Sequence, residues 1–211
     1  MPRISAHEFE RLPLRVHDFL AGVPLHDAWA IDLPGTRAGI ILDEFLRTAS
    51  ARSQVNCDCC ENDRGAKGNL LIGSPVVRTL LSIRFFAGRL LGWDREPAST
   101  AWESFTTRLT TDDRSRSLAL ASTPDGLFRV VYRFENEQLL ELINRTAHAA
   151  ALSALVETAN AYRFYFGVYV QNVGRLPPIY MALVDPFRKL IVYPSLLRSV
   201  RDRWNQAFGT D

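Results

Sequence analysis

The chain has 211 residues, which is enough for one well-packed domain and short for two. Hydrophobic residues make up 47% of it and charged residues 23%, a balance that excludes a largely disordered chain. The formal net charge is +2, so no strong overall field favours nucleic acid as a partner. We therefore expect a single globular domain over residues 1–211.

Targeting and redox signals are few. No apolar run reaches the ~18 residues that a transmembrane helix needs, and the first residues lack the apolar centre of a signal peptide. Cys57, Cys59 and Cys60 lie too close together to form a disulfide framework. They also lack the two separated pairs of a structural zinc site. We expect a cytoplasmic protein without a bound metal.

The first half of the chain predicts an irregular start, one strand and two helices. Residues 1–26 mix proline, glycine and polar side chains and form an irregular lead-in. Residues 27–33 alternate as a half-buried strand and end at a Pro-Gly turn. Residues 39–49 and 74–93 carry apolar side chains at helical spacing. Between these helices, the polar residues 50–68 with the cysteines predict a mobile loop.

From residue 102 onward the apolar period changes to two, which predicts an antiparallel meander. Residues 136–144 are ambiguous between helix and strand. The alanine-rich run at 146–157 favours a helix by propensity. We predict a strand there because a hairpin turn and a strong strand partner follow. The predicted strands cover residues 102–110, 115–122, 128–134, 146–157 and 162–171.

The last stretch, residues 177–208, carries apolar side chains at steps of three and four, the pattern of an amphipathic helix. Two prolines suit its first turn. Pro186 and Pro194 fall inside the pattern, where each removes a backbone hydrogen bond. We therefore expect a kinked helix or two abutting pieces, with bends near Asp185 and Tyr193.

Five short stretches carry a resemblance to a known family: residues 16–20 (VHDFL), 24–27 (PLHD), 134–137 (FENE), 180–188 (YMALVDPFR) and 192–194 (VYP). Together with the element order, they resemble a bacterial domain family of unknown function associated with the START, polyketide-cyclase and birch-pollen-allergen superfamily (SRPBCC). The resemblance implies an α+β helix-grip fold, in which a curved antiparallel sheet wraps around a long C-terminal helix and encloses an apolar cavity. It implies no catalytic residue.

The residues themselves also favour a cavity between the sheet and the terminal helix. If the dry strand faces point at that helix, small side chains such as Ala150 and Ala154 leave volume on one wall. A close approach of the helix would fill this volume instead. The residues expected to bind a ligand there are Tyr132, His148, Ala150, Leu152, Tyr162, Phe164, Phe166, Tyr180, Val184 and Phe187.

Three residues are candidates for acid–base chemistry in this cavity. A neutral His148 can hydrogen-bond a ligand or act as a general base, although a satisfied core histidine is the commoner case. Tyr132 offers a hydroxyl group, with core packing as the alternative. Glu103 becomes a candidate only if its strand face is the inner one, and otherwise it is simply solvated.

The remaining polar residues favour structural interpretations. His17-Asp18 and His26-Asp27 lie in the irregular segment without further ligands, and Asp185 is typical of a helix cap. Glycine-rich phosphate loops, nucleophile elbows and HExxH motifs are missing from the sequence, so we expect no cofactor.

Three functional hypotheses follow from these patterns. The first is binding of a hydrophobic small molecule, such as a lipid, polyketide or aromatic metabolite, between the sheet and the C-terminal helix. The second is a cyclase- or lyase-like acid–base enzyme acting on such a molecule in the same cavity. The third is a membrane-peripheral module, in which Arg198, Arg201 and Arg203 with Trp204 dock on an anionic surface.

Overall fold

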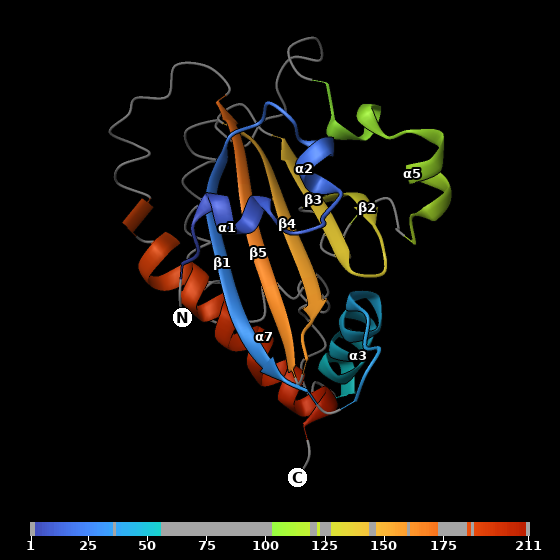
Figure 1. Cartoon of the computed structure of the whole chain (residues 1–211), viewed down its shortest axis with the longest axis vertical. Coiled ribbons are helices and arrows are strands. Elements are labelled where there is room, and N and C mark those ends of the chain that lie inside the picture. Colours follow the sequence, from blue (N-terminus) through green and yellow to red (C-terminus); the bar gives the residue numbers. More distant parts are fainter. Residues whose placement is uncertain are drawn as a thin grey trace.

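A computed structural model describes residues 3–35, 37–55, 103–118, 122, 128–143, 147–159, 161–172, 185–186 and 188–209. Its centre is a curved antiparallel sheet of five strands in the order β1-β5-β4-β3-β2 (Figure 1). The strands are β1 (Leu25–Pro34), β2 (Arg129–Arg133), β3 (Glu137–Ile143), β4 (Ala147–Glu157) and β5 (Ala161–Asn172). The predicted α+β class with a curved antiparallel sheet is confirmed.

Helices lie on both sides of this sheet (Figure 1). None of those in the described part has the length and apolar character that crossing a membrane requires. The helical elements are α1 (Ala6–Glu10), α2 (Val16–Phe19), α3 (Leu42–Val55), the 3-10 turn η2 (Phe105–Arg108), α5 (Thr111–Arg116), the π-helical segment η3 (Arg188–Val192) and α7 (Tyr193–Phe208).

One face of the sheet packs against α3 and α7. Phe164 and Phe166 of β5 belong to the same buried cluster as Phe45 of α3 and Leu197 and Trp204 of α7. The Trp204 indole N–H donates a hydrogen bond to the carbonyl oxygen of Pro34 at 2.9 Å, which ties the end of α7 to the end of β1. This face is the apolar layer between sheet and terminal helix that the sequence predicts.

The opposite face packs against the N-terminal segment. Ala150 and Ala154 of β4 belong to the cluster that holds Phe9 of α1 and Phe19 of α2. The Phe9 ring lies so close to Gly167 of β5 that a Cβ on that glycine would stand 2.8 Å from the ring. The volume left by these small side chains is therefore occupied by the N-terminal helices, and the sheet is buried on both faces.

The regular strands agree with their predicted positions. The strands predicted at 27–33, 128–134, 146–157 and 162–171 correspond to β1, β2, β4 and β5, and the ambiguous residues 136–144 form β3. The alanine-rich β4 is a strand because it pairs along its whole length with β5 on one side and over residues 148–154 with β3 on the other. Tertiary pairing here outweighs the helix propensity of alanine.

Four predictions about the irregular parts are wrong. The predicted strand at 115–122 overlaps α5, which continues to Arg116, and Ser122 forms an isolated bridge with Arg129 in place of a strand. Residues 102–110 do not form a strand, because the Ser104 and Thr110 side chains cap the helical turns of η2 and α5. The lead-in at 1–26 contains α1, which Ser5 caps, and α2. The predicted loop at 50–68 starts too early, since α3 continues to Val55. The predicted helix at 74–93 and all three cysteines lie outside the described residues.

The terminal helix changes its hydrogen-bonding pattern where the sequence places a proline. Residues 188–192 are π-helical, and the regular α-helix begins at Tyr193, next to Pro194. Pro194 has no N–H to donate, so the regular pattern cannot run through it unbroken. The predicted interruption near Tyr193 is therefore confirmed. The residues between 173 and 184, where the prediction starts the helix, lie outside the described residues.

Candidate functional site

The residues predicted to line one cavity lie on two different faces of the sheet. In the β4–β5 register, Ala150 pairs with Tyr169 and Leu152 with Gly167, so these side chains share the face of α1 and α2. Phe164 and Phe166 point to the other face, toward α7. The expectation that Ala150 and Leu152 face the terminal helix is therefore wrong. Tyr180, Val184 and Phe187 lie outside the described residues.

His148 is held by a buried carboxylate. Its Nε2 lies 2.7 Å from Glu141 Oε1, and both side chains are 1% exposed. Glu141 also accepts hydrogen bonds from the Phe105 backbone N–H at 2.6 Å and from the Ser104 hydroxyl at 2.5 Å. The Phe105 ring stacks on the imidazole at 3.9 Å. His148 thus belongs to a network that anchors η2 onto the sheet.

The other predicted polar candidates are dispersed. Glu103 is exposed. Tyr162 is buried on the α7 face, where its hydroxyl accepts from the Ile40 N–H and donates to the Arg37 carbonyl. Tyr132 is fully buried on the opposite face, where its ring meets Phe19 edge-on. Tyr132 and Tyr162 therefore cannot meet one ligand across one cavity.

The His26-Asp27 pair joins the start of β1 to the start of the terminal helix. His26 Nε2 lies 3.2 Å from Asp185 Oδ1, and the Asp185 carboxylate accepts hydrogen bonds from Arg188 at 2.6 Å and Lys189 at 3.1 Å. Burial raises the pKa of Asp185, but these hydrogen bonds outweigh it, so the pKa is lowered overall. Across the described residues, no group of three or more His, Cys, Asp or Glu is arranged to hold a metal ion.

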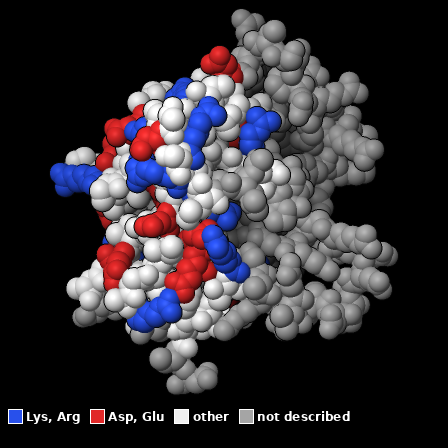
Figure 2. Space-filling view, turned by 90° about the vertical axis from the view of Figure 1, so that its right-hand side faces the viewer, with Lys and Arg blue, Asp and Glu red and all other residues white. Residues whose placement is uncertain are grey.

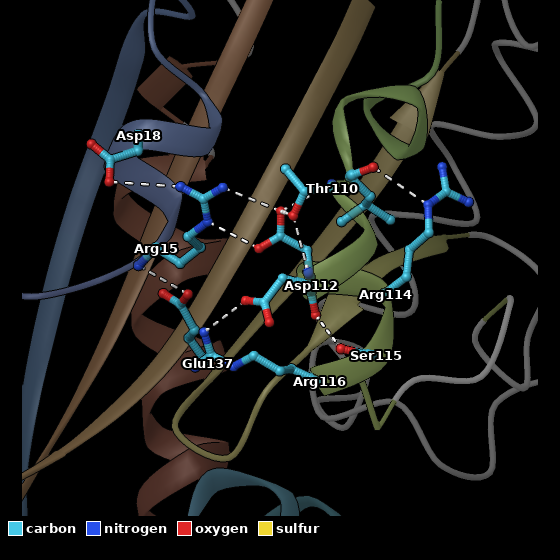
Figure 3. Close-up of polar contacts among 10 residues, drawn as sticks. Arg15, Asp18, Thr110, Asp112, Arg114, Ser115, Arg116 and Glu137 are labelled. Atoms are coloured by element: carbon cyan, nitrogen blue, oxygen red, sulfur yellow. Dashed lines mark hydrogen bonds and ion pairs between the residues drawn. The ribbon is translucent and has the colours of Figure 1, made fainter.

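A polar cluster that the sequence did not single out lies between α2, α5 and the start of β3 (Figure 3). Arg15, which precedes α2, binds the Asp113 carboxylate of α5 with two hydrogen bonds of 3.0 and 3.2 Å. The Arg15 backbone N–H donates to Glu137 Oε1 at 3.0 Å. One residue therefore places two carboxyl groups, one through its side chain and one through its backbone.

These two carboxyl groups have opposite pKa shifts. Burial raises the pKa of Glu137 to about 7, against the opposing effects of the Arg15 and Val16 amides and the Tyr132 hydroxyl. The hydrogen bonds from the Arg15 side chain lower the pKa of Asp113 to about 2, with further help from Thr110. Near neutral pH, Asp113 is therefore a fixed anion, whereas Glu137 exists in both protonation states.

Glu137 also has capacity for a further hydrogen bond. Its side chain is buried, with 4% of the residue exposed, and its Oε2 has no hydrogen-bond partner in the described part of the chain. The neighbouring Tyr132 hydroxyl likewise has no partner of regular geometry there, but it lies close to Glu137, and burial, the Glu137 charge and a hydrogen bond to Glu137 raise its pKa. Each carboxylate oxygen can accept two hydrogen bonds, so Glu137 keeps capacity for a further partner beside Tyr132.

A cavity of about 500 Å³ lies beside this cluster. Its wall combines polar and apolar residues: Pro13, Leu14, Arg15, Arg116, Leu118, Phe134, Glu135, Asn136 and Glu137. The Arg116 guanidinium lies over the Phe134 ring at 5.3 Å, and that ring stacks on Tyr132 at 4.5 Å. A titratable carboxyl group, a cation and an aromatic platform therefore converge on one cavity.

A second cavity of about 370 Å³ lies at the β4–β5 turn. Tyr162 contributes to its wall together with Gly35, Arg37, Ala38, Glu157, Thr158, Ala159 and Ala161. The Tyr162 hydroxyl is already engaged by backbone groups on both sides. This cavity therefore offers less unmet hydrogen-bonding capacity than the one beside Glu137.

Comparison with known proteins places the chain in a family. A family model described as "Protein of unknown function (DUF2867)" matches residues 19–195. The chain belongs to the DUF2867 family. No curated protein and no solved structure matches it. The DUF2867 match includes Asp113, Tyr132 and Glu137, whereas Arg15 precedes it and Trp204 follows it.

The sequence patterns do not predict the cluster of Arg15, Asp113 and Glu137, for identifiable reasons. Glu137 lies in the stretch that was ambiguous between helix and strand, and Asp113 lies just beyond a stretch that was wrongly predicted as a strand. Two signals were present: the FENE motif at 134–137, and a Thr followed three residues later by Asp, which forms the capping box of α5. No local sequence pattern indicates that Arg15 contacts both Asp113 and Glu137.

Proposed function

We propose that this protein binds a small organic molecule with an apolar body in the cavity beside β3 and exchanges a proton with it through Glu137. This is the chemistry of the cyclase- or lyase-like acid–base enzyme that the sequence offered as its second hypothesis, in a different cavity and with a different carboxyl group. The observation that carries the proposal is the position of Glu137: buried, held at Oε1, without a hydrogen-bond partner at Oε2 among the described residues, and on the cavity wall.

The chemistry follows from the protonation state. A general acid or base works best when its pKa is near the working pH, because both forms are then populated. Glu137, with a pKa of about 7, meets this condition. The ionised Asp113 holds the Arg15 side chain, and the backbone of Arg15 orients Glu137. Asp113 and Arg15 are positioning residues in this proposal, and Glu137 is the residue that exchanges the proton.

The apolar part of the ligand is supported by the cavity wall. Leu14 and Phe134 line it, and Leu118, which is 46% exposed, lies at the same wall. Apolar side chains on one part of a mixed wall favour a ligand with an apolar surface on that side. The resemblance to the SRPBCC superfamily supports the same class of ligand, since it implies a sheet that encloses a hydrophobic molecule.

Binding between the sheet and α7, as the sequence predicts, is retained as a second proposal. The two cavities described above do not involve α7. In that layer Phe164 and Phe166 belong to one buried cluster with Leu196 and Leu197. A ligand there has to displace side chains that already pack together.

Hydrogen–deuterium exchange into a substrate tests the proposed function without knowledge of the substrate. The protein is incubated in D₂O with a small-molecule extract of its host, and the extract is analysed by mass spectrometry. We expect one or a few organic compounds to gain deuterium with the wild-type protein, because a Glu137 that has taken up a solvent deuteron delivers it, as a general acid, to a carbon of the substrate.

Two variants make this experiment specific. Glu137→Gln keeps an oxygen that can accept from the Arg15 N–H but cannot exchange a proton, so the deuterium gain should disappear. Glu103→Gln removes an exposed carboxylate outside the cavity and should leave the gain unchanged. The proposal is wrong if no compound gains deuterium above the protein-free control, or if Glu137→Gln exchanges as well as the wild type.

A further inference from the structure

The Arg116 side chain is weakly engaged by the protein. It forms an ion pair with Asp112, one turn earlier on α5, at 3.6 Å, and the two side chains are 62% and 73% exposed. Arg15, by contrast, is bound by Asp113 at 3.0 Å, with Asp18 as a second acid at 3.7 Å. Exposed pairs such as Arg116–Asp112 contribute little to stability, so a ligand can recruit Arg116 at low cost.

The position of Arg116 is nevertheless defined. Its guanidinium lies over the Phe134 ring, and this ring is fixed by its stack with the buried Tyr132. A guanidinium on an aromatic platform presents its planar row of N–H donors along one edge. This geometry matches the two oxygens of a carboxylate. Arg116 also lines the same cavity as Glu137.

The charges around Glu137 favour an anion in its neighbourhood over a cation. Arg15 approaches from the start of α2 and Arg116 from the end of α5, and the buried Asp113 is already paired. Tyr132 from β2 and Tyr169 from β5 are neutral near physiological pH, since burial raises the pKa of both. Glu135 is the remaining acid of the wall, and it is exposed to solvent.

An ionised Glu137 would repel a bound anion, whereas a protonated Glu137 has an O–H to donate to it. Because burial places its pKa at about 7, adding a proton to Glu137 costs little free energy at neutral pH. A cationic ligand would instead meet the weakly paired Arg116 at the wall, since Arg15 is already paired with Asp113. The remaining apolar surface, from Leu14, Leu118 and Phe134, fits a hydrocarbon body.

From these contacts we infer that the ligand is an organic acid: Arg116 binds its carboxylate, the apolar wall holds its body, and Glu137 takes up a proton from solvent when it binds. This inference rests on the proposed function, because it uses the same cavity and the same carboxyl group. It adds the ligand's chemical class and the coupling of binding to proton uptake.

Three probes of equal chain length test it: octanoate, octanol and octylamine. Binding is measured by isothermal titration calorimetry at about pH 8, where Glu137 is largely ionised, in two buffers with different ionisation enthalpies. We expect octanoate to bind most tightly of the three and to take up close to one proton per molecule bound. The organic-acid inference is wrong if octanol or octylamine binds as tightly as octanoate, or if none of the three probes binds.

Variants of two arginines on the same helix supply the matched comparison. Arg116→Gln should weaken octanoate binding at least about tenfold, the loss expected for a charge-assisted hydrogen bond, and leave octanol binding unchanged. Arg114→Gln removes the same charge from an exposed arginine that bonds to the Thr106 and Leu109 carbonyls instead, and should leave octanoate binding unchanged. Equal effects of the two substitutions would contradict a specific role of Arg116.

Glu137→Gln separates this inference from the proposed function. The side-chain amide that this substitution introduces can still donate a hydrogen bond, so octanoate should still bind, but the proton uptake should be lost. Proton uptake that persists in Glu137→Gln would overturn the coupling. If octanoate binds most tightly but no compound gains deuterium, only the acid–base function is contradicted. If a compound gains deuterium but octanoate, octanol and octylamine bind equally well, only the organic-acid inference is contradicted.

Discussion

The ring of Phe9 lies directly on the backbone of Gly167: a Cβ added to that glycine would stand 2.8 Å from the ring atom Cζ. Phe9 comes from α1 and is fully buried, and Gly167 lies in the middle of β5 between β1 and β4. This contact fastens the N-terminal helices to the sheet and closes the face that the small side chains of β4 leave open.

Gly167→Ala should therefore destabilise the protein by about 1–3 kcal/mol, the usual cost of overpacking a well-filled core. Urea unfolding measures this change. Phe9→Leu removes the ring atoms that clash, so Gly167→Ala should cost less in the Phe9→Leu background than in the wild type. Equal costs in both backgrounds would show that the two residues do not interact.

Glu137 should make the protein less stable as the pH rises. Its pKa is raised from 4.5 to about 7 by burial, so the folded state holds the proton over a range in which the unfolded state has released it. Unfolding free energy should fall between about pH 4.5 and 7, by a total on the order of 3 kcal/mol. Urea unfolding across this range measures the slope. Glu137→Gln should flatten it, and a slope unchanged by the substitution would contradict the buried carboxyl group as its source.

Asp113 should make the protein more stable as the pH rises, over a lower pH range than Glu137. The Arg15 hydrogen bonds lower its pKa from 3.8 to about 2, so its contribution is present above pH 3.8 and is lost as the pH falls through about 2. Asp113→Ala should cost about 2–3 kcal/mol at neutral pH, because it breaks the pair with Arg15 and the capping box of α5. Thr110→Ala, which breaks only the box, should cost about 1 kcal/mol.

The pH dependence of these two variants separates the ion pair from the cap. The difference in unfolding free energy between wild type and Asp113→Ala should shrink as the carboxyl group is protonated near pH 2. This free-energy difference is measured by chemical unfolding, monitored by circular dichroism, at several acid pH values. If the two substitutions cost the same at neutral pH, the Arg15–Asp113 pair contributes nothing measurable.

Glu141 and His148 should prove to be structural. Glu141 receives hydrogen bonds from His148, from Ser104 and from the Phe105 amide, and together these outweigh the effect of burial and lower its pKa. Glu141→Leu should cost about 3 kcal/mol, because it leaves buried donors unsatisfied. Amide exchange should accelerate at Phe105 in particular. His148→Gln should lower stability and leave deuterium transfer to a substrate intact, and loss of that transfer in a folded His148→Gln protein would restore His148 as a catalytic candidate.

The exposed charges say less about the function of the protein than these buried groups do. The face that carries α3 and α5 shows acidic and basic side chains interspersed (Figure 2). Single exposed pairs on this face, such as Arg116–Asp112, are weak. The informative charges are therefore the few that the fold places in or beside a buried setting.

The sequence by itself determined the kind of most elements. The period-two pattern of residues 162–171 and the three-and-four spacing after Tyr193 predict β5 and α7, because each pattern matches a face that must be buried. The failure at 102–110 is equally local. Aromatic and β-branched residues raise the strand propensity of that stretch. The Ser104 and Thr110 oxygens nevertheless accept hydrogen bonds from helical turns, a competition that propensity does not weigh.

Only the tertiary structure decided which side chains share a site. The β4–β5 register puts Ala150 opposite Tyr169 and away from Phe164, a choice that alternation along one strand leaves open because it depends on the partner. Glu137 resembles any other acid in the sequence. It acquires its raised pKa from burial, which outweighs the lowering effects of Arg15 and Tyr132 from separate parts of the chain. Desolvation of this kind exists only once the chain has folded.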